Sequence, residues 1–573
     1  MRAMWDNHGV EAGIQHLHTY FLFPFSIDKQ AIYEDHADLW RTQTHWMDGL
    51  DEWLSVKPSG PDAGVASALG TWKRTAYRNL DMDSPAYQDM VFFHPFVRRV
   101  FFDTGGLAGN GSDHESLMRC YSIPVPGDSK LWMSAEDRMG RSAKVAITDL
   151  RLYLFANGIG ILSISVEAFH LSSSEALWIN EEMRKIYPSS SRQVREGRIP
   201  ARLAFSLERN GEERVLAEET FRDTSMVGFQ PPLAHTIRSL LYFGNYNRQE
   251  YEPVLDERMI VFTHVVVDPA TTPDGYITSE DYQMLLSRLL YVDRAGTGYR
   301  YDPVFLKQEM DRQLYRRWAH HGTYYGFTSF SNITCSLGVF DCDEHQLREG
   351  FLIHRMFTTR YYLMAMVTLF YRATLLEFAE RTALVSRRLY HDQEDNHISN
   401  ANMRITSDLR AEFLHFSNYW FFDELANKDE ENEHFLLMCR EYRVNSMKNE
   451  IEEEIEKLTV SLHNYYQVRN TEAVNRLAML SLILGAGAVT TGFFGMNFGG
   501  RFAQLVFEPA RGTMATHYGA IAFASLLAMG AILLGVYLVA TNWQDYRVSM
   551  LPRWWLERNS RRTGSLKRGS RIE

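Results

Sequence analysis

The ten residues TGFFGMNFGG, Thr491–Gly500, end a run from Leu477 to Gly500 that contains no charged residue. A second uncharged run extends from Gly512 to Gln544. The hydrocarbon core of a bilayer is about 30 Å thick and a helix rises about 1.5 Å per residue, so roughly 20 apolar residues span it. The two runs therefore predict transmembrane helices at 477–497 and 517–540, joined by an external loop at 498–516.

The charge that follows the second run predicts the topology. The tail at 541–573 is rich in arginine and lysine, and short basic segments beside a membrane span remain in the cytoplasm. With two spans, the large N-terminal part must lie on the same side. The opening residues MRAMWDNHGVEAG lack a basic head followed by an apolar core, so we expect no signal peptide. The sequence thus predicts a multi-pass protein of the inner (plasma) membrane with both termini in the cytoplasm.

Charge and cysteine content exclude several classes of protein. The chain has 573 residues and a formal net charge of −11, but its last 76 residues hold ten Lys and Arg against four Asp and Glu. The acidity therefore lies in the N-terminal part, which argues against nucleic acid as a partner. The four cysteines show no CxxC spacing. A disulfide framework or zinc ribbon is not expected, and a reducing compartment fits.

Residues 1–344 mix strand and helix patterns and predict a cytoplasmic α/β (α+β) domain. The clearest pattern is at 149–168, where Asn157-Gly158 separates two alternating apolar runs and predicts a β-hairpin. The other expected strands are at 16–28, 91–103, 258–268 and within 322–339, and the expected helices are at 175–187 and 279–292.

Residues 345–476 have a helical pattern. The apolar stretch YYLMAMVTLFY, at 361–371, has only eleven residues, too few to cross a bilayer, so a buried helix is predicted. A loop is expected near 426–433. One long helix is then expected from His434 into the first span, with an apolar seam formed by Ile451, Ile455, Leu458 and Leu462.

Two closely spaced C-terminal spans, with Gly-Met-Asn at the outer end of the first, resemble the CorA family of divalent-cation channels. The similarity covers about His434 to Asn542. It implies a cytoplasmic domain, a long stalk helix and a homo-oligomeric funnel, with five copies around one pore. Asn497 would supply an amide-oxygen selectivity ring that holds the hydrated ion, Gly495 would permit the tight turn, and Met496 would pack the loop. Magnesium is the expected ion.

The same resemblance implies which residues line the pore: Phe493, Ala488, Gly485, Leu477, Val474 and Thr471. Ala488 and Gly485 are smaller than the side chains common at these levels in the family, so Phe493 and Leu477 are the expected hydrophobic constrictions. The external loop also differs from the pattern of the family, because Glu508 is its only acidic residue. Attraction of external cations by the loop is therefore expected to be weak.

Regulatory metal sites are not located by the sequence. Acidic runs at Asp429–Glu433 and Glu450–Glu456 are candidates for magnesium feedback, with solvated helix faces as the alternative. The clusters HLH at 16–18, DCDEH at 341–345 and HDQEDNH at 391–397 resemble metal-ligand sets but have no recognised spacing, and we interpret them as ordinary strand or loop residues.

Two other functions stay open. The same fold could carry Zn²⁺, Co²⁺ or Ni²⁺. The enlarged soluble domain could instead sense a small molecule or partner protein and open the pore on demand. An enzyme is not expected, because no Walker loop, nucleophile elbow or HExxH motif is present. No tightly bound cofactor is expected, and the expected partners are further copies of the chain, the lipid bilayer and divalent cations.

Overall fold

The computed structural model describes residues 11–35, 46–56, 64–76, 82, 84–103, 116–221, 231–295, 301–394 and 399–495, with 518, 519, 522, 523 and 526. The chain divides into two compact units, Met1–Glu456 and Lys457–Glu573. The expected external loop, most of the second span and the basic tail lie outside the described residues.

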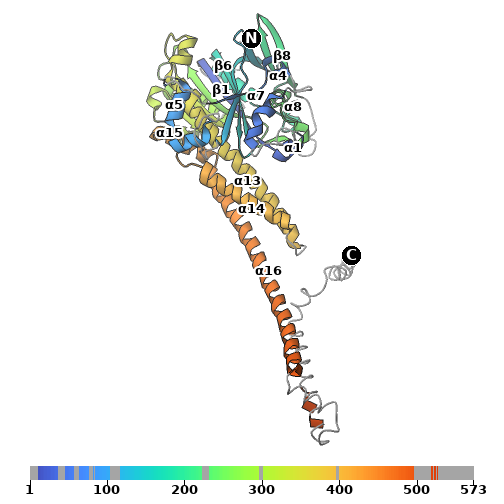
Figure 1. Ribbon diagram of the computed structural model, residues 1–573. Coiled ribbons are helices and arrows are strands. Elements are labelled where there is room, and N and C mark those ends of the chain that lie inside the picture. Colours follow the sequence, from blue (N-terminus) through green and yellow to red (C-terminus); the bar gives the residue numbers. More distant parts are fainter. Residues whose placement is uncertain are drawn as a thin grey trace, which may run out of the picture. The chain divides into compact units, whose positions relative to one another are not determined.

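The first unit is built on one large mixed sheet (Figure 1). Its main path runs β11-β12-β13-β10-β1-β6-β5-β4-β7-β8, with β2, β3 and β9 on side branches. All pairs are antiparallel except β10 with β13. The strands are β1 (Gly13–Ile27), β2 (Lys73–Thr75), β3 (Met118–Ser122), β4 (Ser129–Glu136), β5 (Ser142–Phe155), β6 (Ile159–Ser172), β7 (Arg202–Arg209), β8 (Glu212–Thr220), β9 (Tyr251–Pro253), β10 (Ile260–Val267), β11 (Leu314–Tyr315), β12 (Tyr324–Phe327) and β13 (Ser331–Leu337).

Helices precede, interrupt and follow this sheet. Their bounds are α1 (Lys29–Asp35), α3 (Leu50–Ser55), α4 (Gly64–Leu69), α5 (Pro85–Phe92), α6 (Pro95–Phe101), α7 (Ser173–Met183), α8 (Ser191–Arg195), α9 (His235–Leu240), α10 (Glu280–Tyr291), α11 (Pro303–Gln313), α12 (Leu352–Met356), α13 (Tyr362–Glu394), α14 (Asn400–His415), α15 (Asp429–Glu441) and α16 (Val444–Gly495). The mixed α/β class expected for the N-terminal part is confirmed.

The β5–β6 hairpin forms where the sequence predicts it. Gly158 has a φ of +100°, which the turn requires and which side-chain-bearing residues rarely adopt. The Asn157 side chain accepts a hydrogen bond from the Ile159 N–H and donates one to Thr374 Oγ1 on α13. The turn that joins the two strands is therefore also tied to the helix that packs on them.

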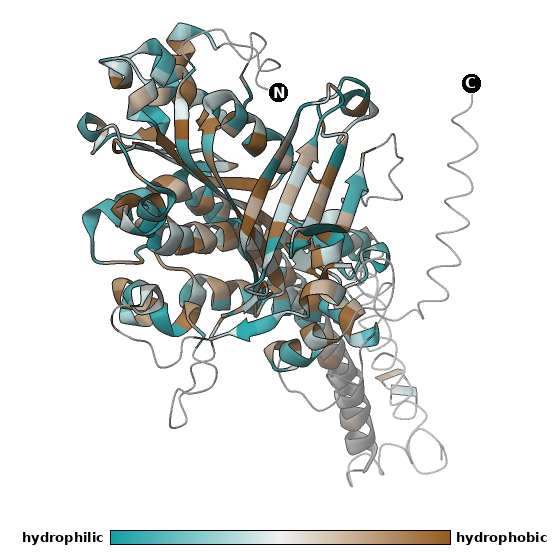
Figure 2. Cartoon of the chain, turned by 90° about the horizontal axis from the view of Figure 1, so that it is seen from above, coloured by the Kyte–Doolittle hydropathy of each residue, from teal (hydrophilic) through white to brown (hydrophobic). Residues whose placement is uncertain are grey.

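Strand β1 is buried on both faces because α7 packs against one side of it and α13 against the other. On one face Leu17 and Phe21 join the main core, and Thr19 donates a hydrogen bond to Asn180 of α7. On the other face the Tyr20 ring lies 4.4 Å from the Tyr362 ring of α13, centroid to centroid. Figure 2 shows hydrophobic residues along the central strands and the helices against them. This explains why the second half of β1, YFLFPF at 20–25, is apolar at successive positions.

Helix α13 is a core helix. Among the described residues, Leu352–Asp392 is the one helical stretch that is long and apolar enough to cross a membrane, but 78% of its most apolar 18-residue window is buried inside the protein. Phe370 stacks on Phe155 of β5 with ring centroids 4.2 Å apart. The prediction of a buried helix at 361–371 is confirmed.

Two local predictions are wrong. Residues 91–103 form α5 and α6 in place of a strand, because Pro85 and Pro95 occupy first-turn helix positions, where their fixed φ is favourable. The predicted loop at 426–433 contains the start of α15, whose first turn holds three acidic residues that interact well with the helix dipole. The long helix begins only at Val444, since Arg443 has a φ of +56° and interrupts it.

Helix α16 has 52 residues and ends at Gly495. Ile451 and Ile455, the first two positions of the predicted seam, are buried, and the next two are half-buried.

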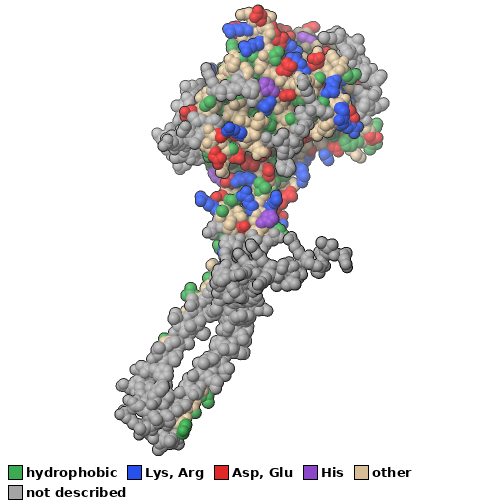
Figure 3. Space-filling model, turned by 90° about the vertical axis from the view of Figure 1, so that its right-hand side faces the viewer, with side chains coloured by type: hydrophobic (Ala, Val, Ile, Leu, Met, Phe, Trp, Pro, Cys, Tyr) green, Lys and Arg blue, Asp and Glu red, His purple; other side chains and the backbone are tan. Residues whose placement is uncertain are grey.

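On the face of the molecule drawn in Figure 3, basic and acidic side chains of the first unit are interspersed. Among the side chains that are coloured on that face, no large patch of positive charge is seen of the kind that binds nucleic acid.

A buried carboxyl at the entry to β9 is expected to make stability depend on pH. Burial raises the pKa of Glu250 to about 7, and the Asp35 carboxylate adds to the increase, although the Asn245 N–H and Arg248 oppose it. The folded state therefore keeps a proton that the unfolded chain releases near its ordinary pKa of 4.5. Since the folded state binds more protons in this interval, stability should fall as pH rises from about 4.5 to 7 and then stay level.

Glu250→Gln tests this expectation, because glutamine keeps the shape and both hydrogen-bonding functions without titrating. Between pH 5 and pH 8, the melting temperature of the variant should decrease less than that of the native chain. Thermal unfolding of both proteins at the two pH values measures the difference, and equal losses would show that Glu250 does not titrate in this range.

Candidate metal centre

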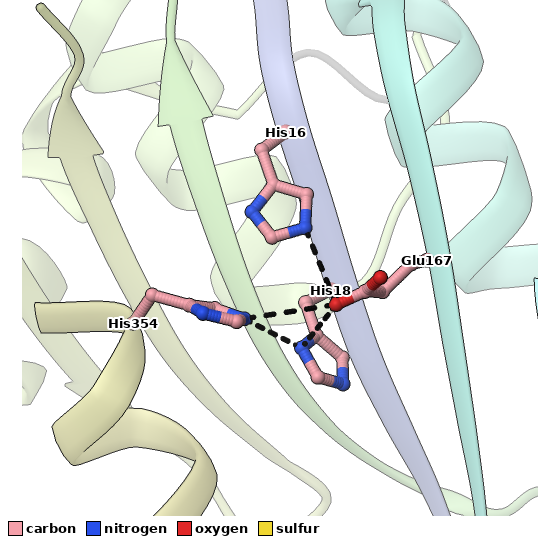
Figure 4. Close-up of side chains that lie close together, drawn as sticks. All are labelled: His16, His18, Glu167 and His354. Carbon is pink, nitrogen blue, oxygen red and sulfur yellow. Dashed lines mark hydrogen bonds and ion pairs between the residues drawn. The ribbon is translucent and has the colours of Figure 1, made fainter. Parts of the chain in front are cut away.

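Four metal-ligating side chains meet on the sheet face that α12 and α13 cover (Figure 4). His16 and His18 are two residues apart on β1, so they point to the same face. Glu167 lies directly opposite His18 on the neighbouring strand β6. His354 reaches the same point from α12, and all four residues are buried.

The carboxylate of Glu167 is at the centre of the cluster. Its Oε1 atom lies 3.6 Å from His16 Nε2, 3.2 Å from His18 Nδ1 and 3.8 Å from His354 Nε2. The His18 and His354 nitrogens are 2.7 Å apart. One ligand atom from each of the four residues fits within 4.8 Å of every other.

A second set of contacts orients these ligands. His354 Nδ1 donates a hydrogen bond to the Arg348 carbonyl at 2.9 Å, which leaves its Nε2 lone pair facing the cluster. His18 Nε2 lies 2.8 Å from Ser165 Oγ. The Arg348 guanidinium contacts Glu167 Oε2 through two nitrogens, each at 2.7 Å. The other carboxylate oxygen, Oε1, is therefore the one that faces the histidines.

His16 is the exception, because neither of its ring nitrogens has a hydrogen-bond partner among the described residues. Its side chain is fully buried, and its ring stacks on Phe169 with centroids 4.6 Å apart. The nearest charged atom, Glu167 Oε1, is at ion-pair distance. A buried imidazole without partners is costly and rare in folded proteins.

The electrostatics keep His18 and His354 neutral and the Glu167 carboxyl ionised. Burial lowers the pKa of His18 well below its ordinary value and that of His354 to about 4. Burial alone would raise the pKa of Glu167, but His16, His18 and Arg348 beside it bring that pKa down to about 2. Metal ions bind to neutral imidazoles and to ionised carboxylates, so His18, His354 and Glu167 are in the forms that can act as ligands.

His264 lies next to the cluster. It is paired with His18 across β1 and β10, and its ring centroid is 5.6 Å from that of His354. Its Nε2 atom lies 3.1 Å from Ser336 Oγ, while its Nδ1 atom has no hydrogen-bond partner among the described residues. Burial lowers the pKa of His264 well below its ordinary value, so this ring is also neutral.

The donor set suits a first-row transition ion. Three imidazole nitrogens and one carboxylate oxygen are typical ligands of Zn²⁺ and its neighbours, whereas Mg²⁺ prefers oxygen alone. In a tetrahedral site with bonds of about 2.0 Å, neighbouring donors are about 3.3 Å apart. The three distances to Glu167 Oε1, 3.2 to 3.8 Å, lie around this value, whereas the His18 and His354 nitrogens, 2.7 Å apart, would have to separate slightly to hold an ion.

The residues that the sequence predicts to line a pore are not near this cluster in the chain. Thr471, Val474, Leu477, Gly485 and Ala488 are in α16 and are exposed. Phe493 and Gly495 are in the last turns of the same helix. Met496 and Asn497 lie outside the described residues.

The acidic candidates at Asp429–Glu433 are largely engaged in the first unit. Glu430 accepts a hydrogen bond from the Trp318 indole at 2.8 Å, and Glu431 pairs with Arg360 at 3.0 Å. Glu433 lies 3.4 Å from Arg317. These carboxylates contact neighbouring side chains and help to hold α15 in place.

The other clusters make ordinary local contacts. Asp343, in DCDEH, accepts a hydrogen bond from the Gln346 N–H, and Asp392, in HDQEDNH, accepts one from the Ser399 N–H. The remaining residues of HDQEDNH, at 395–397, lie outside the described residues. In Glu450–Glu456, Glu452 lies 3.5 Å from Lys448.

The interpretation of HLH as ordinary strand residues missed the partners that the fold supplies. Glu167 and His354 are far from residues 16–18 in sequence, so no spacing could link them. One signal was present: Glu167 is the only charged residue in the apolar run that forms the second strand of the predicted hairpin. A charge inside a buried strand requires a partner.

No known protein family, curated protein or solved structure matches this chain. The fold and the cluster therefore define it only by class, as a mixed α/β protein with a buried three-histidine, one-glutamate cluster and a long C-terminal helix.

Proposed function

We propose that the protein is a CorA-like, homo-oligomeric membrane channel that passes a divalent cation, Mg²⁺ foremost, into the cytoplasm. The observation that carries the proposal is the course of α16, which is continuous from the acidic first unit to Gly495, the first residue of Gly-Met-Asn. The helix continues without a break through the first apolar run as far as Gly495, and Met496 and Asn497 follow directly in the sequence.

The chemistry of the motif supports a filter for hydrated ions. Mg²⁺ releases its water molecules reluctantly, so a pore that must let the ion go again is better lined by neutral amide oxygens than by carboxylates. Asn497 supplies one such oxygen per chain. One copy cannot encircle an ion, so the proposal requires a symmetric ring with Asn497 near the axis.

The driving force would be the membrane potential. It favours inward movement by about 2.3 kcal/mol per charge for each 100 mV, and a divalent ion gains twice that. The proposal needs neither ATP nor a redox cofactor, in keeping with the absence of a nucleotide-binding motif in the sequence.

Flux into proteoliposomes tests the proposal. The native chain should carry at least one of Mg²⁺, Zn²⁺, Ni²⁺ and Co²⁺ faster than protein-free vesicles do, and the ion carried best identifies the substrate. Flux that appears only after a cytosolic extract is added would support the gated version of the channel. No flux in any of these conditions would contradict the proposal.

A further inference from the structure

We propose that His16, His18, Glu167 and His354 bind one first-row transition-metal dication, with Zn²⁺ as the representative ion. The bound ion would join β1 and β6 to α12 within the first unit. This site is separate from the filter proposed at Asn497, and it does not depend on the protein being a channel.

The His16 imidazole, which has no hydrogen-bond partner among the described residues, points to a missing ligand. A neutral histidine in a protein core usually donates from one nitrogen and accepts at the other. His16 does neither among the described residues, although it is fully buried and its Nε2 atom faces the Glu167 carboxylate (Figure 4). A metal ion between these atoms would satisfy the nitrogen and the oxygen together.

The hydrogen bond between His18 Nδ1 and His354 Nε2 lies where the ion would bind, so metal binding would replace it. His354 Nδ1 donates to the Arg348 carbonyl, so its Nε2 atom accepts and His18 Nδ1 must carry the shared proton. Metal binding would transfer this proton to His18 Nε2, which would then donate to Ser165 Oγ. That oxygen is already 2.8 Å away, so the change requires a new tautomer and little movement.

Glu167 is prepared to bind through one oxygen. Arg348 holds Oε2, while Oε1 faces the three histidines. With one carboxylate oxygen and three neutral nitrogens, the bound site would carry a net charge of +1. The Glu167–Arg348 contact is typical of the outer interactions that orient metal ligands.

A hydrogen-bonded core cluster without metal is the competing interpretation. It accounts for His18 and His354, which bond to each other, and for Glu167, which bonds to Arg348. It leaves both ring nitrogens of His16 without a hydrogen-bond partner among the described residues, with Glu167 Oε1 only at ion-pair distance, 3.6 Å from Nε2. The metal site accounts for all four residues.

Metal content distinguishes the two interpretations. The full-length chain, purified in detergent and stripped with a chelator, would be dialysed against limiting Zn²⁺ in excess Mg²⁺ and its metal content measured. We expect the native chain to retain one more Zn²⁺ per chain than His16→Gln or His354→Gln. The control His345→Gln, at an exposed histidine that precedes the helical turn Gln346–Gly350 and lies outside the cluster, should match the native chain. Equal zinc content in the native chain and both cluster variants would overturn the proposal.

A second measurement uses only the native chain, so it stands even if the variants fail to fold. X-ray absorption at the zinc edge should show nitrogen and oxygen neighbours at about 2.0 Å, with the outer scattering of several imidazoles. A sulfur shell, or oxygen neighbours without imidazole, would overturn the assignment.

Zinc should also raise the melting temperature of the native chain and leave that of a folded His16→Gln variant unchanged, because the ligands meet only in the folded state. Neither result depends on ion flux.

Discussion

Replacing Asn497 by alanine is expected to abolish most divalent-ion flux into proteoliposomes while leaving the amount and assembly of the protein unchanged. In the proposed ring, each amide oxygen accepts a hydrogen bond from water on the entering ion. Such a bond contributes about 1 kcal/mol net, and 1.4 kcal/mol corresponds to about a factor of ten. Because the substitution removes one oxygen from every copy in the ring, flux should fall by about tenfold or more.

Two further variants make this result specific. Asn464→Ala makes the same change at an exposed position of α16 well before the motif, and its flux should equal that of the native chain. Asn497→Asp should also conduct poorly, because a ring of charges would bind the ion too tightly to release it. If Asn497→Ala carried ions as fast as the native chain, the Gly-Met-Asn motif would not be part of the ion path.

Replacing Phe370 by alanine is expected to cause the largest loss of stability among the changes considered in the first unit. The side chain is fully buried in α13 and stacks on Phe155 of the sheet, with the Phe101 and Phe416 rings about it at centroid distances of 6.1 and 6.3 Å. Truncating a buried phenylalanine costs about 3–5 kcal/mol, because apolar contacts are lost and a cavity remains.

Thermal unfolding of the full-length chain in detergent measures this loss. Leu384→Ala is the matched control, since Leu384 is on the same helix and is 46% exposed. The melting temperature of Phe370→Ala should be clearly lower than those of the native chain and the control. If both variants melted at the same temperature, the packing of α13 on the sheet would not be a main source of stability.

Local sequence rules predicted much of the first unit. The β5–β6 hairpin followed from Asn157-Gly158, because that dipeptide favours the required backbone angles. The buried helix at 361–371 followed from length alone. Both predictions depend on neighbours in the sequence, and both are confirmed.

Non-local features were beyond these rules. The position of β1 between β6 and β10 is decided by contacts across more than a hundred residues, and the sequence does not encode it locally. The cluster of His16, His18, Glu167 and His354 depends on that pairing. Alternation along β1 placed the two histidines on one face, but only the strand register places Glu167 opposite His18.

The error at 91–103 has a different cause. Aromatic and β-branched residues favour strands, and VFFHPFVRRVFFD contains many of them. Proline at the first turn outweighs this preference, since its ring fixes φ near the helical value and its missing N–H costs nothing there. Tertiary packing then buries Val97, Val100 and Phe101 on one side of α6.

The mass of the intact complex in detergent, measured by native mass spectrometry, tests most directly whether Asn497 can form a pore. The account predicts a closed ring, with five chains as the expected number, because only several copies around one axis can surround an ion with amide oxygens. A protein that stays monomeric or dimeric at all concentrations, in detergent and in lipid nanodiscs, would contradict it.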